Sequence, residues 1–281
     1  MHELEPLPVG IIIVATPLGN IADASPRLAH ALAQADFIAA EDTRRTRNLA
    51  QALGVSIRGQ VLSNFDHNEH GRVAQLIEHA RHASVAVITD AGMPVVSDPG
   101  FPLVQAAHDA GIPVTCFPGP SAVPTAIALS GLAVGKFAFD GFAPRRSGPR
   151  RAWLESLKTE ERAVCFFESP HRIADTLAEA ADILGADRQA AVARELTKKF
   201  EEVKRGTLSE LAAWASDGLK GEITCVIAGV DRTKVVDVSD LVDEVNARVA
   251  QGERLKTVCS DVAQIHGVSK KELYNAVLES R

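Results

Sequence analysis

The run GIIIVAT at residues 10–16 constrains the fold most strongly, because it is continuous, largely β-branched and only strand-sized. Strands of this kind are buried on both faces, which is typical of parallel sheets covered by helices. Segments with helical character separate it from later runs; Ser25-Pro26 has the cap and first-turn chemistry that begins a helix. The later runs lie at residues 36–42 (DFIAAED), 84–90 (SVAVITD) and 112–117 (IPVTCF). The sequence predicts a parallel α/β domain over residues 9–117.

The pattern changes near the sequence PGPSA at residues 118–122, where we place a domain junction. Strand-like segments continue beyond it, but several connections are short enough for antiparallel pairing. These segments are 137–142, 162–169, 189–195, 201–206 and 221–230. They predict a second α/β domain over residues 118–232. From Asp231 only helical periodicity remains, which predicts a small helical tail at 236–281.

Composition bounds the class of protein. A chain of 281 residues with 46% apolar content can bury two domain cores. No apolar run reaches the 18 residues of a membrane span, and the amino-terminal MHELEPLP lacks the pattern of a secretory signal, so we expect a cytoplasmic protein. The cysteines, none of them in a C-x-x-C pair, read as reduced core thiols and not as a zinc site. They are Cys116, Cys165, Cys225 and Cys259.

Charge distribution permits an RNA ligand without requiring one. The net charge is −6, so the whole chain is no polycation. Basic residues are nevertheless bunched in RRTR at 44–47 and RRSGPRR at 145–151. Nucleic-acid binding depends on where charge lies and not on its sum. The alternative interpretation is a solvated surface run, which we favour for Arg150 and Arg151.

Three loops rich in glycine and proline predict a small-molecule pocket. The G-x-G-x-x-G, P-loop and H-E-x-x-H patterns are all absent from the sequence. Instead TPLGN (16–20), DAGMPVVSDPG (90–100) and PGPSA (118–122) each follow a predicted parallel strand. In open α/β sheets ligands bind at the carboxyl ends of the strands, and glycine lets backbone approach them closely. Each loop alone could be an ordinary turn, but three at one edge favour a binding site.

Together with EDTR (41–44), ESPHR (168–172) and a late KGE before the last strand (220–222), these loops carry a resemblance. In this order they resemble the ribosomal RNA small subunit methyltransferase I family of the tetrapyrrole methylase superfamily, over about residues 9–230. The resemblance implies two α/β domains with S-adenosyl-L-methionine in the cleft between them. It also implies 2′-O-methylation of a cytidine ribose in the decoding region of 16S rRNA, with the assembled 30S subunit as the expected partner, and a homodimer. Met93 stands where the corrin and sirohaem methylases have an aspartate, which disfavours a tetrapyrrole substrate.

The resemblance also assigns site residues. It implies cofactor contacts from backbone and apolar walls in the three loops and at the end of one later strand. These residues are Leu18, Asp90, Ala91, Gly92, Met93, Val96, Asp98, Ser121, Ala122 and Phe167. For phosphate contacts we expect Arg44, Arg45 and Arg146, because the planar guanidinium can donate two hydrogen bonds at once. Methyl transfer of this kind requires no metal, and we expect none.

A base that takes the proton of a ribose hydroxyl could accelerate transfer by about 10²–10⁴. The sequence leaves several candidates open. Asp42 could equally be a helix N-cap, and Glu168 could form a structural ion pair with Arg172. The candidates are Glu41, Asp42, His67 and Glu168, with Glu69 and His171 beside them.

Two further hypotheses concern the tail and the competing functions. Ala263 and Gly267, four residues apart among apolar positions, suit a helix-turn-helix that contacts nucleic acid. The competing functions are a tetrapyrrole or protein side-chain methylase of the same fold and a non-catalytic RNA-binding assembly factor. The basic loops and the tail disfavour the first, and the intact glycine loops disfavour the second.

Overall fold

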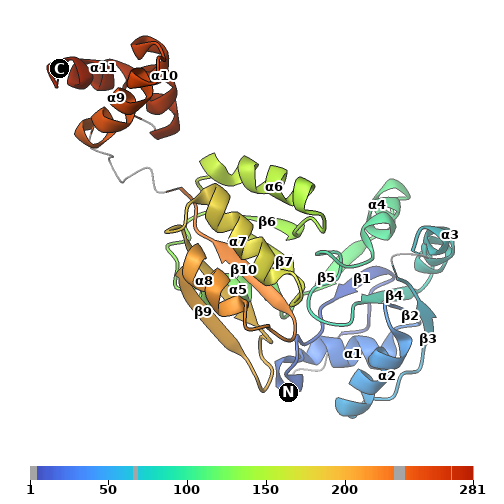
Figure 1. Ribbon diagram of the computed structural model, residues 1–281. Coiled ribbons are helices and arrows are strands. Elements are labelled where there is room, and N and C mark those ends of the chain that lie inside the picture. The colour runs from blue at the N-terminus through green and yellow to red at the C-terminus, as the bar shows by residue number, and fades with distance from the viewer. Residues whose placement is uncertain (1–4, 66–68, 231–237, 267, 281) are drawn as a thin grey trace. The chain divides into compact units, whose positions relative to one another are not determined.

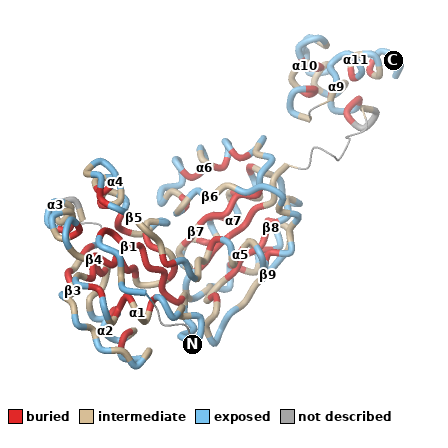
Figure 2. The backbone as a smooth tube through the Cα atoms, turned by 180° about the vertical axis from the view of Figure 1, so that it is seen from behind, coloured by how far each residue is buried: buried red, intermediate tan, exposed pale blue. Residues whose placement is uncertain are grey.

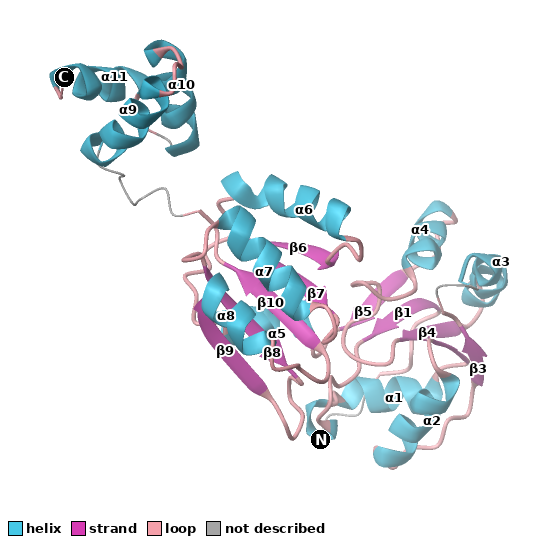
Figure 3. Ribbon diagram, in the orientation of Figure 1, coloured by secondary structure: helices cyan, strands magenta, loops and turns pink. Residues whose placement is uncertain are grey.

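The computed structural model describes residues 5–65, 69–230, 238–266 and 268–280 (Figure 1). The chain divides into two compact units, Met1–Ala228 and Gly229–Arg281. Within the described residues the first unit contains two five-stranded sheets, and the second is helical (Figure 3). No helix among these residues is long and apolar enough to cross a bilayer.

The first sheet is entirely parallel, with strand order β3-β2-β4-β1-β5. Its strands are β1 (Gly10–Val14), β2 (Phe37–Ala40), β3 (Gln60–Ser63), β4 (Ser84–Ile88) and β5 (Val114–Phe117). The strands β1 and β4 are buried along their whole length (Figure 2), which explains their continuous apolar sequence. The expected strands are confirmed, but β3 was missed. It is a four-residue edge strand that begins on an exposed glutamine, so it carries no apolar run.

Helices cover both faces of this sheet. They are α1 (Pro26–Gln34), α2 (Thr43–Ala52), α3 (Glu69–Ala80) and α4 (Phe101–Asp109), with a short 3₁₀ turn at Ile21–Asp23. One core joins α1 and α2 to the sheet through Leu28, Leu32 and Ala50, and a second joins α3 and α4 through Leu76 and Leu103. As expected, Ser25 caps α1, because its hydroxyl accepts the Leu28 amide at 3.0 Å and Pro26 follows in the first turn.

The second sheet is mixed, with strand order β6-β7-β10-β8-β9. Its strands are β6 (Phe137–Phe142), β7 (Ala163–Glu168), β8 (Gln189–Arg194), β9 (Glu202–Thr207) and β10 (Ile223–Ile227). The pair β6–β7 is parallel, whereas β10 pairs antiparallel with β7 and β8, and β8 pairs antiparallel with β9. The expectation of antiparallel pairing in this half is therefore confirmed.

One face of the second sheet packs against α6, α7 and α8, and the other packs against α5. These helices are α5 (Ala122–Leu129), α6 (Ser147–Ser156), α7 (Ile173–Leu184) and α8 (Leu208–Ala215), with a 3₁₀ turn at Leu157–Thr159. Side chains alternate along β10, so both cores receive residues from it. Cys225 packs in the core with α6, α7 and α8, and Val226 packs in the core with α5. Cys165, Cys225 and Cys259 are buried and Cys116 is half-buried, as expected of core thiols.

The second unit contains a 3₁₀ turn at Val238–Leu241 and the helices α9 (Val242–Ala250), α10 (Leu255–His266) and α11 (Lys270–Glu279). Its core is aliphatic and includes Val245, Val258, Val262, Leu273 and Val277, all fully buried. Ala263 lies in this core, as its small size suggested. Gly267 lies outside the described residues, so the helix-turn-helix remains a prediction.

The interpretation of Arg150 as a solvated surface residue was wrong. Its side chain is 6% exposed and lies between α6 and α7, where Nε and Nη2 each contact a Glu179 oxygen at 2.8 Å. Ser147 donates a further hydrogen bond to Glu179 at 2.7 Å. The hydrogen bond from Arg150 is the main reason that the pKa of Glu179 falls to about 2. Arg151 is half-exposed and paired with Asp182, closer to the expectation.

This pair predicts a pH-dependent contribution to stability. A carboxyl whose pKa is lowered on folding stabilises the native state above its unfolded pKa, and this contribution is lost as pH falls through the folded value. We expect Glu179→Gln to lower the free energy of unfolding by about 2–3 kcal/mol at neutral pH, since a buried guanidinium loses its counter-charge. The difference should shrink as pH falls from 4.5 toward 2.

Urea unfolding of both proteins across this pH range measures the effect. Glu155→Gln is the matched control, because Glu155 also lies in an ion pair beside α6, with Lys158 of the following 3₁₀ turn, but is half-exposed. It should cost less than about 1 kcal/mol at any pH. Equal losses of unfolding free energy in the two variants would contradict a stabilising role for the Arg150–Glu179 pair.

Candidate active site

A cavity of about 400 Å³ opens where the carboxyl edge of the first sheet meets the second sheet. From the first half of the chain its lining residues are Leu18, Glu41, Arg45, Thr89, Asp90, Ala91, Gly92, Met93, Val96, Asp98, Ser121 and Ala122. From the second they are Phe142, Phe167, Glu168, Ser169, Pro170, Gly221, Glu222, Ile223 and Thr224. All ten residues predicted to contact the cofactor line this one cavity. The parallel strands bring their loops together, as the sheet geometry requires.

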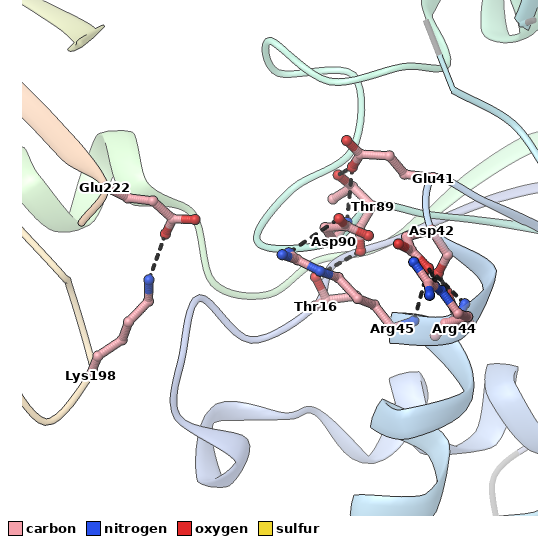
Figure 4. A network of polar contacts seen from close by, with 10 residues as sticks. Thr16, Glu41, Asp42, Arg44, Arg45, Thr89, Asp90, Lys198 and Glu222 are labelled. Carbon is pink, nitrogen blue, oxygen red and sulfur yellow. Dashed lines mark hydrogen bonds and ion pairs between the residues drawn. The ribbon is translucent and has the colours of Figure 1, made fainter. Parts of the chain in front are cut away.

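Two backbone hydrogen bonds join the loop after β1 to the loop after β4. The Thr16 amide donates to the Gly92 carbonyl at 2.8 Å, and the Gly92 amide donates to the Thr16 carbonyl at 3.1 Å. The Thr16 hydroxyl also donates to the Thr89 carbonyl at 3.2 Å (Figure 4). The amide of Gly92 is therefore engaged within the protein. Gly92 contributes an open surface to the cavity and not a free donor.

Glycine is favoured at position 92 for two reasons. Its φ of +86° lies in the left-handed region, and a Cβ there would stand 3.1 Å from Cδ2 of Leu18. Val95 and Ser97, farther along the same loop, also have positive φ values of 73° and 65°. Non-glycine residues rarely adopt this conformation, and such strain is concentrated at ligand sites. The Glu69 carboxylate supports the end of the loop by accepting the Gly100 amide at 2.8 Å.

A charged wall follows β2 and β4 (Figure 4). The Glu41 carboxylate accepts the Thr89 hydroxyl at 2.7 Å and the Asp90 amide at 3.1 Å. Arg45 reaches over from α2 and its Nη1 lies 3.2 Å from Oδ2 of Asp90. Burial, and then the neighbouring Glu41 charge, raises the pKa of Asp90, while Arg45 opposes this rise. The wall therefore holds two adjacent carboxylates, one of which retains its proton more readily than usual.

The other predicted bases have different positions. Asp42 caps α2: its carboxylate accepts the amides of Arg44 and Arg45 at 2.7 and 3.1 Å, and these bonds lower its pKa. Glu168 lines the cavity but is 2% exposed, and it accepts the Ser169 amide and the Thr176 hydroxyl at 2.7 Å each. It also pairs with Arg172, the structural alternative left open by the sequence. His67 lies outside the described residues.

The predicted phosphate-binding arginines are divided. Arg44 and Arg45 both lie in the first turn of α2 beside the cavity, and the Arg44 side chain is 88% exposed. Arg45 belongs to the cavity wall itself. Arg146 is exposed immediately before α6 and does not line the cavity.

Sequence reasoning missed the wall formed by Gly221–Thr224. Because β10 runs antiparallel to β7, its first residue, Ile223, pairs with Glu168 at the end of β7. Lys198 fixes this wall by contacting Glu195 at 2.8 Å and Glu222 at 2.9 Å. Gly221 has a φ of +90°, and a Cβ there would stand 2.4 Å from Glu195 atoms. The glycine in KGE was the available signal, but only the strand pairing relates it to the cavity.

Within the described residues no group of three or more His, Cys, Asp or Glu side chains is arranged to hold a metal ion. The cavity instead combines backbone loops, apolar side chains and carboxylates. Ser121 and Ala122 add the amino end of α5, where first-turn amides favour an anionic group. This combination suits an organic ligand that carries both charges.

Comparisons with known proteins agree with this architecture. Residues 10–212 match the model of the tetrapyrrole (corrin/porphyrin) methylases. Among solved structures, a uroporphyrin-III-C-methyltransferase from Thermus thermophilus aligns with a TM-score of 0.55 at 17% identity, covering 79% of this chain and 94% of that one. A cobalt precorrin-4 methyltransferase aligns with a TM-score of 0.57 at 16% identity, covering 78% and 95%. At these identities the likeness shows the fold alone.

Relatives of higher identity define the family. A protein of Mycobacterium tuberculosis named ribosomal RNA small subunit methyltransferase I is 54% identical, covering 96% of this chain and 95% of the relative. Proteins of the same name from Synechocystis (39% identical; 96% and 98% covered) and Escherichia coli O157:H7 (36% identical; 96% and 95% covered) are also similar. The chain belongs to the ribosomal RNA small subunit methyltransferase I family, within the tetrapyrrole methylases.

The geometry at Gly92 generates a test of the cavity. Gly92→Val should displace Leu18 and narrow the space between the first two loops. We expect calorimetric binding of S-adenosylmethionine, the cofactor that the resemblance implies, to weaken at least about tenfold, a loss of 1.4 kcal/mol or more.

Gly54→Val is the control, because Gly54 also has a positive φ but a Cβ there meets no atom within 4 Å. Thermal unfolding of both variants separates the shared backbone strain from the loss of binding. Unchanged affinity in folded Gly92→Val would remove this loop from the ligand site.

Proposed function

We propose that this protein uses S-adenosylmethionine to methylate the 2′-hydroxyl of a cytidine ribose in the decoding region of 16S rRNA. The observation that carries the proposal is the convergence of the three glycine-rich loops and the Glu41–Asp90 wall on one cavity. The names of its relatives support small-subunit ribosomal RNA as the substrate. The resemblance supports the cytidine, the ribose position, the assembled 30S subunit, a homodimer and a cytoplasmic location.

The residues present fit the cofactor. A cavity of about 400 Å³ lies within the range of small-molecule sites. Leu18, Met93 and Phe167 supply apolar contacts for an adenosine, and the amino end of α5 suits a carboxylate. Acidic side chains are more numerous than basic ones in the lining, although Asp90, Glu168 and Glu222 each pair with a cation, Arg45, Arg172 and Lys198 respectively. Carboxylates at the cavity wall are compatible with a ligand that carries cationic sulfonium and ammonium groups. The charged lining residues are Glu41, Asp90, Asp98, Glu168 and Glu222 against Arg45.

S-adenosylmethionine would supply the methyl group as an electrophile bonded to a positively charged sulfur. The protein's part is to hold the ribose oxygen in line with that methyl group, which can lower the barrier by about 7–11 kcal/mol. As the oxygen–carbon bond forms and the carbon–sulfur bond breaks, the hydroxyl loses its proton. Glu41 is our choice of acceptor, because it lines the cavity and is held in place by Thr89 and Asp90. Asp42 and Glu168 serve as a cap and a buried ion-pair partner instead.

The direct experiment incubates the protein with radiolabelled S-adenosylmethionine and 30S subunits from cells that lack the modification. Ribose methylation removes the 2′-hydroxyl needed for alkaline cleavage. The label should therefore appear in one alkali-resistant dinucleotide that begins with cytidine. Free 16S rRNA in parallel tests the assembled subunit as substrate. Label in alkali-sensitive nucleotides, or none in RNA, would contradict the proposal.

In the same assay Glu41→Gln tests the base. The amide oxygen of glutamine can still accept the Thr89 and Asp90 hydrogen bonds, so the loop should keep its geometry. We expect kcat to fall by about 10²–10⁴ while cofactor affinity stays within twofold. Asp42→Asn is the control, since asparagine also caps helices and should cost little activity. A fall in cofactor affinity that accounts for the whole loss would assign Glu41 to binding.

Substitution of Arg44 tests whether this side chain contacts an RNA phosphate. Each phosphate contact released should reduce the log–log dependence of affinity on salt by about 0.7 for a single strand. Arg44→Ala should flatten that slope by about one contact without changing cofactor binding. Arg45 is unsuitable for this test because it also pairs with Asp90. Arg58→Ala is the control: Arg58 precedes β3 and so lies at the opposite edge of the parallel sheet. Equal slopes for all three proteins would make Arg44 a solvated residue.

A further inference from the structure

The strand β6 contains an extra residue relative to its partner β7. Phe139 pairs with Cys165 and Phe142 pairs with Phe167, so three steps along β6 correspond to two along β7. Strict alternation would place Phe139 and Phe142 on opposite faces of the sheet. The bulge at Asp140–Gly141 reverses this alternation, so both rings contact Phe167. The ring centroids lie 4.9 Å (Phe139) and 5.4 Å (Phe142) from that of Phe167, both edge to face.

A hydrogen bond from α6 holds the bulge on one side, and the loop after β4 lies close to it on the other. The Trp153 indole of α6 donates a hydrogen bond to the Asp140 carboxylate at 2.7 Å. Gly141 has a φ of +69°, in the left-handed region that glycine adopts more readily than other residues. A Cβ at Gly141 would stand 3.3 Å from Oγ of Ser97, in the strained loop after β4. The two halves of the cavity rim therefore meet at Ser97 and Gly141.

The consequence is an exposed aromatic ring in the cavity wall. Phe142 lines the cavity and yet is 60% exposed, whereas its neighbours Phe139 and Phe167 are half-buried. A large apolar side chain kept in solvent by a dedicated bulge loses the stabilisation that burial would supply. Bulges that redirect a side chain in this way are frequent beside active sites.

We propose that Phe142 stacks on the nucleobase of the acceptor nucleotide and so positions its ribose toward the Glu41–Asp90 wall. This proposal rests on the proposed function. Unpaired RNA bases are recognised by stacking on aromatic side chains, and a base held in this way fixes the position of the ribose attached to it. The Glu41–Asp90 wall sets two carboxylates against one guanidinium, that of Arg45, so it is a poor place for a phosphate and suits an uncharged base better. Arg44 outside the cavity remains for the phosphates.

The test compares Phe142→Leu and Phe142→Tyr in methylation of 30S subunits that lack the modification. Leucine keeps the apolar volume but removes the aromatic face, whereas tyrosine retains it. We expect kcat/KM for the subunit to fall roughly 5- to 100-fold in Phe142→Leu and to stay within about twofold in Phe142→Tyr. Affinity for S-adenosylhomocysteine, measured by calorimetry, should be unchanged in both. Phe200→Leu is the matched control, since Phe200 is 66% exposed but does not line the cavity.

Three outcomes would overturn the proposal. Full activity of Phe142→Leu would show that the ring does not contact the acceptor. A matching loss of S-adenosylhomocysteine affinity would assign the ring to the cofactor. A change of oligomeric state in sedimentation would assign it to contact with a second copy of the chain. Failure of the proposed function itself would give a different result from these three. The wild-type protein would then be inactive on 30S subunits although it still binds the cofactor.

Discussion

The pair of backbone hydrogen bonds between Thr16 and Gly92 is the contact on which the cavity depends. It joins the loops after two adjacent parallel strands, β1 and β4, whose register consists of five residue pairs. Once the loops are joined, Leu18 lies over Gly92, and no side chain fits at position 92 without moving it. The adjacent loop adopts left-handed backbone at Val95 and Ser97, and the packed sheet beneath compensates for that strain.

The carboxylates that follow β2 and β4 have different hydrogen-bond partners and therefore different roles. Glu41 and Asp42 are adjacent in sequence but have different partners, because α2 begins immediately after Asp42. The Asp42 carboxylate accepts amides of the helix, and the Glu41 carboxylate accepts hydrogen bonds from Thr89 and Asp90. Arg45, in the first turn of the helix, pairs with Asp90 and limits the rise of the Asp90 pKa. The five residues from Glu41 to Arg45 therefore supply a cavity carboxylate, the N-cap of α2 and the guanidinium that pairs with Asp90.

The second sheet forms the remaining walls of the cavity, and its strand pairing differs from that of the first sheet. Its sheet is mixed, so the beginning of β10 meets the end of β7, and residues far apart in sequence share one wall. A bulge in β6 adds an aromatic ring that simple alternation would have turned away. Lys198 pairs with both Glu195 and Glu222 and so stabilises the part of this wall at the start of β10. The cavity therefore combines a parallel edge with an antiparallel one.

The sequence by itself determined the strands with continuous apolar runs and the loops that follow them. It also determined which residues share the parallel edge, because parallel strands release their loops on one side. For that reason the predicted cofactor residues in the three loops line one cavity, whereas Phe167 reaches it from β7 of the second sheet. The sequence could not separate Glu41 from Asp42, because capping depends on where the helix begins. It missed β3, the burial of Arg150 and the re-aimed Phe142, because edge pairing, ion pairing between helices and strand register are set by partners distant in the chain. Local pattern thus decided which elements form, and tertiary packing decided which side chains face one another.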